Sequence, residues 1–325
     1  MRALFQARLK VLCTILGVGV FCASHAQTFP DRPVQIITPY AAGGGLDIVT
    51  RAVAAKLSDK WGKQVIVENR PGAGSTVGTA AAAKAPKDGY TLLVASTPLG
   101  VAPAVYANLP YDARKDFVPL SLVGTTPEVM VVNAGLGVST LAEFIKKAKA
   151  EPGKMNFGSA GSGTLAHLAA DTVNRRLGLG STHVPYKGVT PAVTDLIGGV
   201  IQWQVDTPSA FLQHVRAGKL KALALAAPAR SPQMPDVPTF AELGYPNLEF
   251  RIFHGLLAIA GTPEPELRAL EAGIVEVLKD PALRSTLEKQ GWEPAPTGSK
   301  VFAAFLDEQL PRLQAAAKAA GVKAD

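Results

Sequence analysis

The feature that most restricts the fold of this chain is a repeated alternation of two kinds of segment. Short runs of β-branched residues alternate with longer, alanine-rich segments of helical spacing. Apolar residues that recur every three to four positions indicate amphipathic helices, whereas short β-branched runs bounded by turn residues indicate strands. Helices that alternate with strands cover a sheet whose strands are largely parallel. The sequence therefore predicts an α/β fold.

The expected elements account for most of the chain. Strands are predicted at residues 34–40, 64–69, 90–96, 118–124, 128–133, 181–188, 200–206, 219–227 and 249–261. Helices are predicted at residues 46–62, 75–85, 141–150, 190–199, 209–218, 263–280 and 300–321, and a strand, a loop and a helix share residues 155–178.

Two places in this order could carry the chain between lobes, near residues 124–127 and 250–254. A chain that crosses twice builds one lobe from both of its ends and the other lobe from its middle. We therefore expect residues 27–124 plus 252–325 to form lobe 1 and residues 125–251 to form lobe 2. The cleft between two such lobes, joined by a hinge, is a natural ligand site.

The first 26 residues have the three-part layout of a secretory signal peptide. Arg2, Arg8 and Lys10 precede an apolar run at residues 11–23, and Ser24-His25-Ala26 offers small residues for a signal peptidase. The run is too short to span a bilayer comfortably. We expect cleavage after Ala26 and a periplasmic protein.

Cysteine and charge exclude several kinds of function. Cys13 and Cys22 both lie in the expected leader, so the mature chain can form no disulfide, thiol nucleophile or thiolate metal site. The net charge of +7 falls to +4 without the leader, with 30 basic against 26 acidic residues. This mild excess suits a small anion. No dense basic run interleaved with aromatic residues indicates a nucleic-acid partner.

Three glycine-rich loops each lie between a predicted strand and a predicted helix: AAGGGLD at 41–47, NRPGAGSTVG at 69–78 and FGSAGSGT at 157–164. A helix N-terminus attracts negative charge, and glycine lets a ligand approach the backbone closely. Ser159, Ser162 and Thr164 add hydroxyl donors. Ordinary turns, with Thr164 as a simple N-cap, remain the alternative.

Nucleotide-binding and catalytic motifs are missing from the sequence. No G-x-x-x-x-G-K-[ST] occurs, and the last glycine of the second loop, Gly78, is one residue too far for the dinucleotide pattern. No serine has glycine two positions before and two after it, and no H-E-x-x-H pair occurs among the scattered histidines. We therefore expect no enzyme, no metal and no cofactor.

Two acids stand at the ends of predicted elements, and the second of them has two open interpretations. Asp47, in the first helical turn after the first loop, normally just complements the helix dipole. Asp206 follows an apolar strand and needs a partner, which could be a ligand ammonium or hydroxyl, or the backbone of its own turn. Trp203 is expected in the core.

Several stretches resemble one family over essentially the whole mature chain. They are PYAAGGGLDIVTRAVAAKL, VIVENRPGAGSTVGTAAAAKAPKDGYTLL, LPYDARKDFVPLSLV, MNFGSAGSGTLAHL, HVPYKGVTPAVTDLIGG and AGKLKALALAAPARSPQMPDVPTFAELG. They are similar to the Bug, or TctC, family of extracytoplasmic solute receptors of tripartite tricarboxylate transporters. The resemblance implies a two-lobe, type II periplasmic binding protein that closes on a small organic anion.

The resemblance also implies where the ligand binds. The loop after the first strand and the loop before the middle-lobe helix hold carboxylate in that family, and Asp206 matches an acid that faces the ammonium in amino-acid-binding members. The implied ligand-binding residues are Tyr40, Ala41, Ala42, Gly43, Gly44, Asp47, Ser96, Thr97, Ser159, Ala160, Gly161, Ser162, Gly163, Thr164, His167 and Asp206.

We therefore expect a monomeric receptor that captures a di- or tricarboxylate, an acidic amino acid or an aromatic carboxylate for a membrane permease. A sensor for a signalling partner and an α/β hydrolase are the alternatives. One departure from the family pattern concerns the segment RIFHG at 251–255, where an inward-pointing Arg251 could pair with a second carboxylate.

Overall fold

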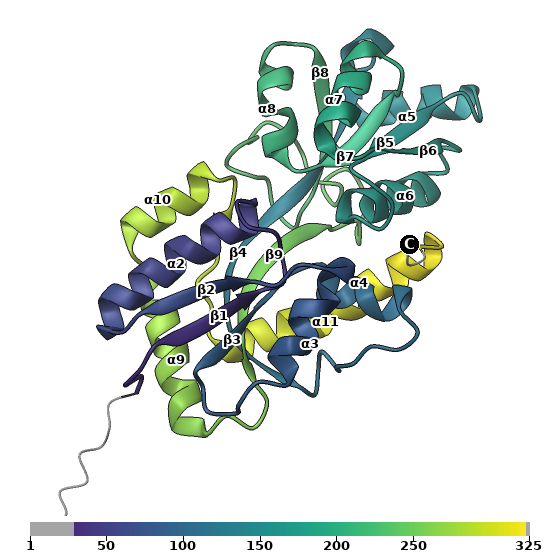
Figure 1. Cartoon of the computed structure of the whole chain (residues 1–325). Helices are drawn as coiled ribbons and strands as arrows, with labels where there is room; N and C mark the ends of the chain where they lie inside the picture. Colours follow the sequence, from purple (N-terminus) through teal and green to yellow (C-terminus); the bar gives the residue numbers. More distant parts are fainter. Residues whose placement is uncertain (1–28, 323–325) are drawn as a thin grey trace, which may run out of the picture.

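The computed structural model describes residues 29–322 and confirms the α/β prediction (Figure 1). In the first half, β1 (Val34–Thr38) pairs in parallel with β2 (Val65–Asn69) and with β3 (Thr91–Ala95). The next strand in the sheet, β9 (Arg251–Ile259), runs antiparallel to β3. The sheet is therefore mixed, because a segment from near the C-terminus enters it in the opposite direction.

The strand β4 (Phe117–Asn133) passes through both halves of the molecule. The sequence predicted two strands here, at 118–124 and 128–133, and that prediction was wrong. Residues 117–127 of β4 pair with β9, and residues 128–133 pair with β7 (Trp203–Asp206) and β8 (Leu220–Ala226). Since new partners replace β9 at the point where its pairing ends, the strand continues without a break. Figure 1 shows β4 and β9 side by side between the two halves.

The second half adds β5 (Asn156–Ser159) and β6 (Thr182–Pro185) to β7, all in parallel. The order across the sheet is β2-β1-β3-β9-β4-β7-β5-β6, with β8 and the short β10 (Glu293–Pro294) also paired to β4. The expected crossing segments lie opposite each other, since Thr126 pairs with Ile252. The lobe boundaries at 124/125 and 251/252 stay a prediction, which this change of partners along β4 supports.

Helices occupy both faces of the sheets. Their bounds are α2 (Gly45–Trp61), α3 (Thr76–Ala83), α4 (Pro98–Val105), α5 (Leu141–Ala150), α6 (Leu165–Leu177), α7 (Val189–Gly198), α8 (Pro208–Arg216), α9 (Glu264–Val277), α10 (Pro281–Lys289) and α11 (Ser299–Ala319), with short 3₁₀ turns η1 (Ala73–Ser75) and η2 (Ala134–Leu136).

The sequence analysis did not predict α4 and α10. α4 contains Gly100 and Pro103, which weaken a helix on their own. Packing against α11 compensates, because a Cβ atom at Gly100 would lie only 3.0 Å from Leu313. α10 carried a usable signal: Asp280 accepts a hydrogen bond from the Leu283 amide (2.8 Å), and Pro281 occupies the first helical position.

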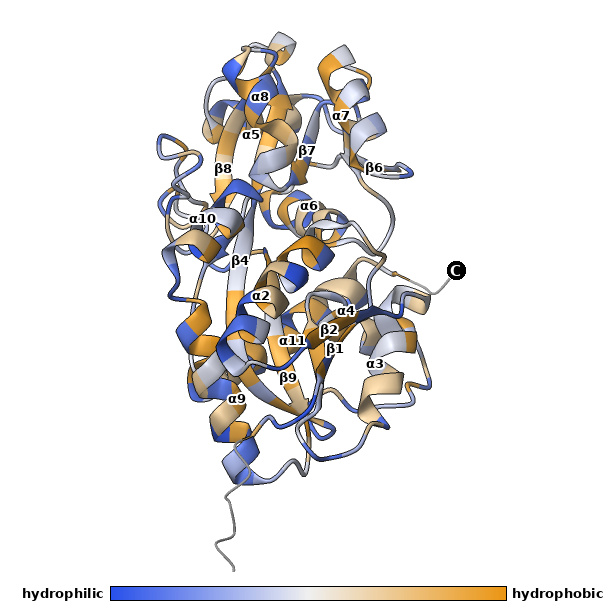
Figure 2. Ribbon diagram, turned by 60° about the vertical axis from the view of Figure 1, so that its left-hand side comes forward, coloured by the Kyte–Doolittle hydropathy of each residue, from blue (hydrophilic) through white to orange (hydrophobic). Residues whose placement is uncertain are grey.

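The core follows from the two-residue period of the strands. In β3, Leu92 and Val94 point to the side covered by α2 and α9, whereas Leu93 and Ala95 point to the side covered by α3, α4 and α11. The strands are correspondingly hydrophobic and the helices show polar outer faces in Figure 2. Each fully buried aliphatic side chain contributes about 1.5–3 kcal/mol, so helices on both faces are required.

No helix within residues 29–322 is long and apolar enough to span a membrane. The expected signal peptide at residues 1–26 lies outside the described residues.

Gly255 in β9 offers a test of this packing. A Cβ atom added there would lie 2.1 Å from Cζ of the fully buried Phe302. Gly255→Ala is expected to lower the free energy of unfolding by about 1–3 kcal/mol, because the ring or the strand must move. Urea denaturation measures the change. Gly198→Ala is the control, since a Cβ atom there meets nothing within 4 Å. Equal stabilities of the two variants would contradict the packing described.

Candidate functional site

A cavity of about 600 Å³ lies where loops from the two halves of the molecule meet. This volume is in the range of small-molecule sites. The loops that follow β1 and β3 supply one side, and the loop before α6 supplies the other. Six of the predicted ligand-binding residues line it, namely Tyr40, Ser96, Thr97, Ser162, Gly163 and Thr164.

The remaining predicted residues do not line this cavity. They are Ala41, Ala42, Gly43, Gly44, Asp47, Ser159, Ala160, Gly161, His167 and Asp206. Their roles as ligand contacts stay predictions, and the contacts of six of them show what they do within the protein.

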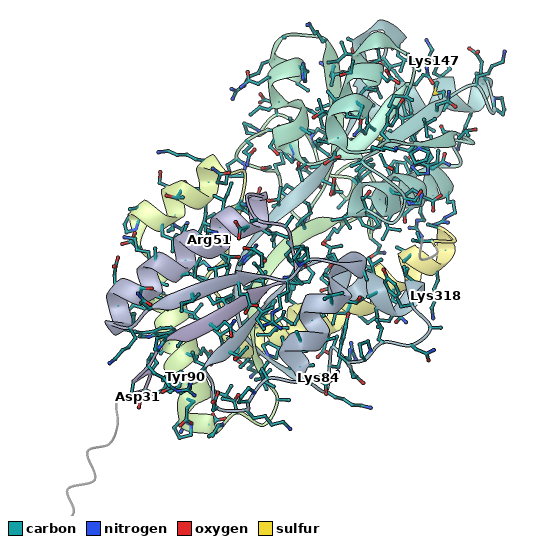
Figure 3. All side chains as sticks on the ribbon, in the orientation of Figure 1. Asp31, Arg51, Lys84, Tyr90, Lys147 and Lys318 are labelled. Atoms are coloured by element: carbon teal, nitrogen blue, oxygen red, sulfur yellow. The ribbon has the colours of Figure 1, made fainter. Side chains whose placement is uncertain are left out.

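Asp47 stabilises the loop between β1 and α2. Its carboxylate accepts hydrogen bonds from the Gly43 amide (2.8 Å), from Arg51 Nε (3.0 Å) and from Asn69 Nδ2 (2.8 Å). Burial alone would raise the pKa of Asp47, but the hydrogen bonds from Arg51, Gly43 and Asn69 lower it. Arg51, labelled in Figure 3, comes from the next turn of α2. The carboxylate is therefore fully used inside the protein, and the Gly43 amide is used with it.

The loop before α6 is also braced by local hydrogen bonds. Thr164 is the N-cap of α6: its Oγ1 accepts a bond from the His167 amide (3.3 Å) and donates one to the Gly161 carbonyl (2.8 Å). The Gly163 amide donates to His167 Nδ1 (3.1 Å), and the Gly161 amide donates to Ser159 Oγ (3.3 Å). Ser162 and the amides of the first turn of α6 other than that of His167 remain for a ligand, because the first N–H groups of a helix have no intrahelical acceptor.

A pair of stacked histidines lies against this loop. The rings of His167 and His183 are 4.0 Å apart, and His183 Nε2 lies 2.7 Å from Ser159 Oγ. Burial lowers the pKa of His183 to about 4, an effect that the neighbouring His167 reinforces, and burial lowers the pKa of His167 as well. Both rings are neutral near pH 7, so the unprotonated Nδ1 of His167 can accept the hydrogen bond from the Gly163 amide. The pair positions the loop, and the sequence analysis did not identify His183 in this role.

Ser96 and Thr97 have the strongest signature of ligand contacts. They follow β3 and line the cavity, and their side chains are 1% and 5% exposed. Neither hydroxyl makes a hydrogen bond of normal geometry among the described residues, although Ser96 lies close enough to the Tyr40 phenol to affect the pKa of that phenol. A buried polar group left in this state costs about 1–3 kcal/mol, and a ligand oxygen would remove that cost. Burial also raises the pKa of the nearby Tyr40 phenol, which therefore stays neutral.

The far wall of the cavity is apolar, and the sequence analysis missed it. It comes mainly from α4, with Pro98, Val101, Ala102 and Val105. Since α4 itself was not predicted, its residues could not be placed. The order Ser96-Thr97-Pro98, a capping residue before a proline, was the available signal.

The end of α11 closes the cavity from the C-terminal side. Val322 lines it, and a Cβ atom at Gly163 would lie 2.9 Å from Val322 Cγ1. Arg175 Nη1 on α6 donates a hydrogen bond to the Ala319 carbonyl (2.6 Å). Figure 1 shows this end of α11 beside α6. Two segments far apart in the sequence thus form one wall.

Asp206 lies at the end of β7, opposite Val129 of β4. Its Oδ1 accepts the amide of the adjacent Thr207 (2.8 Å), whereas the turn interpretation expected bonds from the backbone of residues 208–210. Burial raises the pKa of Asp206 to about 6. The neighbouring Glu128, which the sequence analysis missed, is 1% exposed, and burial together with the charge of Asp206 raises its pKa well above the ordinary value. This pair lies beside the cavity-forming elements without lining the cavity.

Two other residues fall outside the cavity. Trp203 belongs to the core, as expected: it is fully buried, and its Nε1 donates to Ser181 Oγ (3.0 Å). The Arg251 guanidinium lies 5.5 Å from the centre of the Phe305 ring and does not line the cavity. A pairing of Arg251 with a second ligand carboxylate therefore stays a prediction.

The cavity carries no formal charge on its described walls. None of the lining residues within 29–322 is Asp, Glu, Lys, Arg or His. In the same part of the chain, no three His, Cys, Asp or Glu side chains lie where they could share a metal ion. An anion held here is neutralised by hydroxyl and helix N-terminal dipoles.

Comparisons with known proteins agree with this geometry. Residues 49–322 match the model of a family described as "Tripartite tricarboxylate transporter family receptor", TctC. Protein BugT of Bordetella pertussis is 36% identical over 319 residues, which are 96% of this chain and 98% of BugT.

Two solved structures are also similar to this chain. The structure "R. palustris Rpa4515 with adipate" is 28% identical, with a TM-score of 0.74 over 91% of this chain and 99% of that one. MatC of Rhodopseudomonas palustris with bound malate is 31% identical, with a TM-score of 0.69 over 89% of this chain and 100% of that one. The expected two-lobe, type II periplasmic binding protein fold is confirmed by such likenesses.

Asp47 is expected to act on stability. Asp47→Ala removes the acceptor of the Gly43 amide and one of the two acceptors of Asn69 Nδ2, so the free energy of unfolding should fall by about 2–3 kcal/mol. Asp59→Ala is the matched control, since Asp59 is exposed on the same helix. Thermal and urea denaturation compare the two. A loss of stability no larger than that of the control would show that the hydrogen bonds of the Asp47 carboxylate do not stabilise the fold.

Asp206 should make stability depend on pH. Its folded pKa of about 6 exceeds its unfolded value of about 3.9, so between these pH values only the unfolded state releases the proton. The contribution of Asp206 to the free energy of unfolding therefore falls as the pH rises from about 4 to 7. Asp206→Asn removes this pH-dependent loss. The free energy of unfolding of the variant minus that of the wild type should therefore increase by about 1–3 kcal/mol between pH 4 and pH 7. A flat difference for Asp206→Asn would be inconsistent with the raised pKa.

Proposed function

The chain belongs to the TctC family of tripartite tricarboxylate transporter receptors, and on this basis we propose that it captures a small organic carboxylate in the cavity between its lobes. It would then present the ligand to the membrane components of a tripartite transporter. The family consists of periplasmic solute-binding receptors, so the protein is a receptor and not an enzyme.

The observation that carries the proposal is the pair of buried hydroxyls of Ser96 and Thr97, which line the cavity and have no partner among the described residues. A carboxylate accepts several hydrogen bonds at once and would satisfy both. Ser162 and the N-terminus of α6 face the cavity from the other half of the molecule. The similar proteins with adipate and with malate support the same ligand chemistry.

Contacts from both halves suggest how binding drives closure. A ligand that touches Ser96 on one side and Ser162 on the other gains most in the conformation that brings them together. Its higher affinity for that closed form shifts the population toward it. β4 and β9 would act as the hinge, because they are the strands that continue from one half into the other. Export by cleavage after Ala26 belongs to the same proposal.

The test is a direct binding measurement with mono-, di- and tricarboxylates and with their neutral amides. The full chain is expressed with its own leader and purified from the periplasmic fraction. Calorimetry or thermal shift should detect carboxylates, since a ligand that binds the folded state raises the melting temperature. Amides or neutral sugars that bind as well as the acids would overturn the proposal. Loss of uptake of the bound acid on gene deletion tests the transport step.

Removing the two hydroxyls should separate binding from stability. Ser96→Ala with Thr97→Val is expected to weaken carboxylate binding about 10- to 100-fold, since two charge-assisted hydrogen bonds are lost. The free energy of unfolding of the ligand-free variant should equal that of the wild type or exceed it by about 1–3 kcal/mol per hydroxyl, because each removed hydroxyl is buried without a partner. Thr297→Val, which removes another unpartnered hydroxyl outside the cavity, is the matched control and should leave affinity unchanged. Wild-type affinity in the double variant would contradict the assignment.

A further inference from the structure

We infer that the ligand is a carboxylate whose body is plain hydrocarbon, aliphatic or aromatic, without an amino or a hydroxyl group next to the carboxylate. This inference rests on the proposed function and narrows it. It excludes amino acids and hydroxy acids, which the carboxylate chemistry alone would admit.

The composition of the cavity wall is the first argument. One part of the surface is polar, with the hydroxyls of Tyr40, Ser96, Thr97, Tyr106, Ser162 and Thr164 and the loop amides; the other part is apolar and includes Leu46, Val101, Ala102, Val105, Leu165 and Ile252. Contact with the apolar part favours apolar ligand surface, and this part offers no donor or acceptor to a polar substituent. A ligand hydroxyl placed against the apolar part would give up its hydrogen bonds to water without replacing them.

The absence of a lining acid is the second argument. An ammonium needs a carboxylate or several carbonyl oxygens when it is buried. The carboxylates of Asp47 and Asp206, the two acids that the sequence analysis singled out, do not line the cavity. Asp47 is occupied by Gly43, Arg51 and Asn69, and Asp206 accepts the Thr207 amide. No acid on the described walls is therefore available to an ammonium group.

The arrangement of the polar and apolar parts is the third argument. Ser96 and Thr97 directly precede α4, so the hydroxyl pair and the apolar helix wall come from one continuous segment. A carboxylate bonded to the hydroxyls thus has apolar side chains immediately beyond it. The volume of about 600 Å³ leaves room for a body of six or more carbon atoms.

Matched sets of ligands test the inference on the protein purified from the periplasm. The first set is succinate, malate and aspartate; the second is adipate, 2-hydroxyadipate and 2-aminoadipate; the third is 3-phenylpropanoate, 3-phenyllactate and phenylalanine. Within each set that binds, we expect the hydroxy acid to bind about 10-fold and the amino acid about 100-fold more weakly than the plain acid. Calorimetric dissociation constants provide the measurement.

The possible outcomes separate this inference from the proposed function. A hydroxy or amino acid that binds more tightly than its plain counterpart overturns the inference and leaves a carboxylate receptor. Neutral diamides that bind as well as the acids overturn the proposed function, and the inference with it. Failure of all nine acids to bind at millimolar concentration also counts against both.

A variant pair tests the wall itself. Val105→Asp places a carboxylate on the apolar side of the cavity, and Val105 is only half-buried, so the helix should tolerate it. The preference for a plain acid over its amino analogue is expected to shrink at least about 10-fold. Val301→Asp, at a position 59% exposed on α11 and outside the cavity, is the control and should keep the wild-type preference. An unchanged preference in Val105→Asp would show that this wall does not contact the ligand body.

Discussion

The antiparallel pair of β4 and β9 is the constraint on which the rest of this structure depends. Residues 117–127 of β4 pair with β9, and the same strand then pairs with β7 and β8. A hydrogen-bonded ladder is stiff along its length and can twist or bend between neighbouring segments. One strand pair therefore fixes how the two halves face each other and leaves a limited motion between them. The cavity lies beside this pair, which supplies Ile252 to its wall.

The glycine-rich loops have an internal structural role in addition to the ligand contacts predicted for them. Much of their hydrogen-bonding capacity is used within the loops: the Gly43 amide bonds to Asp47, and the Gly163 amide bonds to His167. The glycines allow tight, locally satisfied turns at the ends of strands. Ser96 and Thr97 follow such a strand end and line the cavity, and their buried hydroxyls have no partner of normal geometry. In the proposed function these two hydroxyls are donors to the ligand.

A neutral site also suits a receptor that must release its ligand. Hydroxyls and a helix N-terminus hold an anion by dipoles, without the desolvation of a paired cation. The stacked His167 and His183, whose pKa values are lowered by burial, stay uncharged near pH 7 and do not add a positive charge beside the loop. In the proposed function, selectivity among anions is then left to the shape and polarity of the surrounding wall, to which α4 contributes four residues and Val322, beyond the end of α11, one more.

The sequence by itself determined the α/β class, the positions of most strands and helices, the family and six of the residues that line the cavity. These features depend on local periodicity, on turn chemistry and on motifs that are contiguous in the chain. Only the tertiary structure decided that β4 is one strand, since its continuity depends on partners from residues 203–259. It alone placed Val322 beside Gly163 and left Ser96 and Thr97 without partners. Burial and the lack of a partner are properties of the whole packed chain, and no local pattern encodes them.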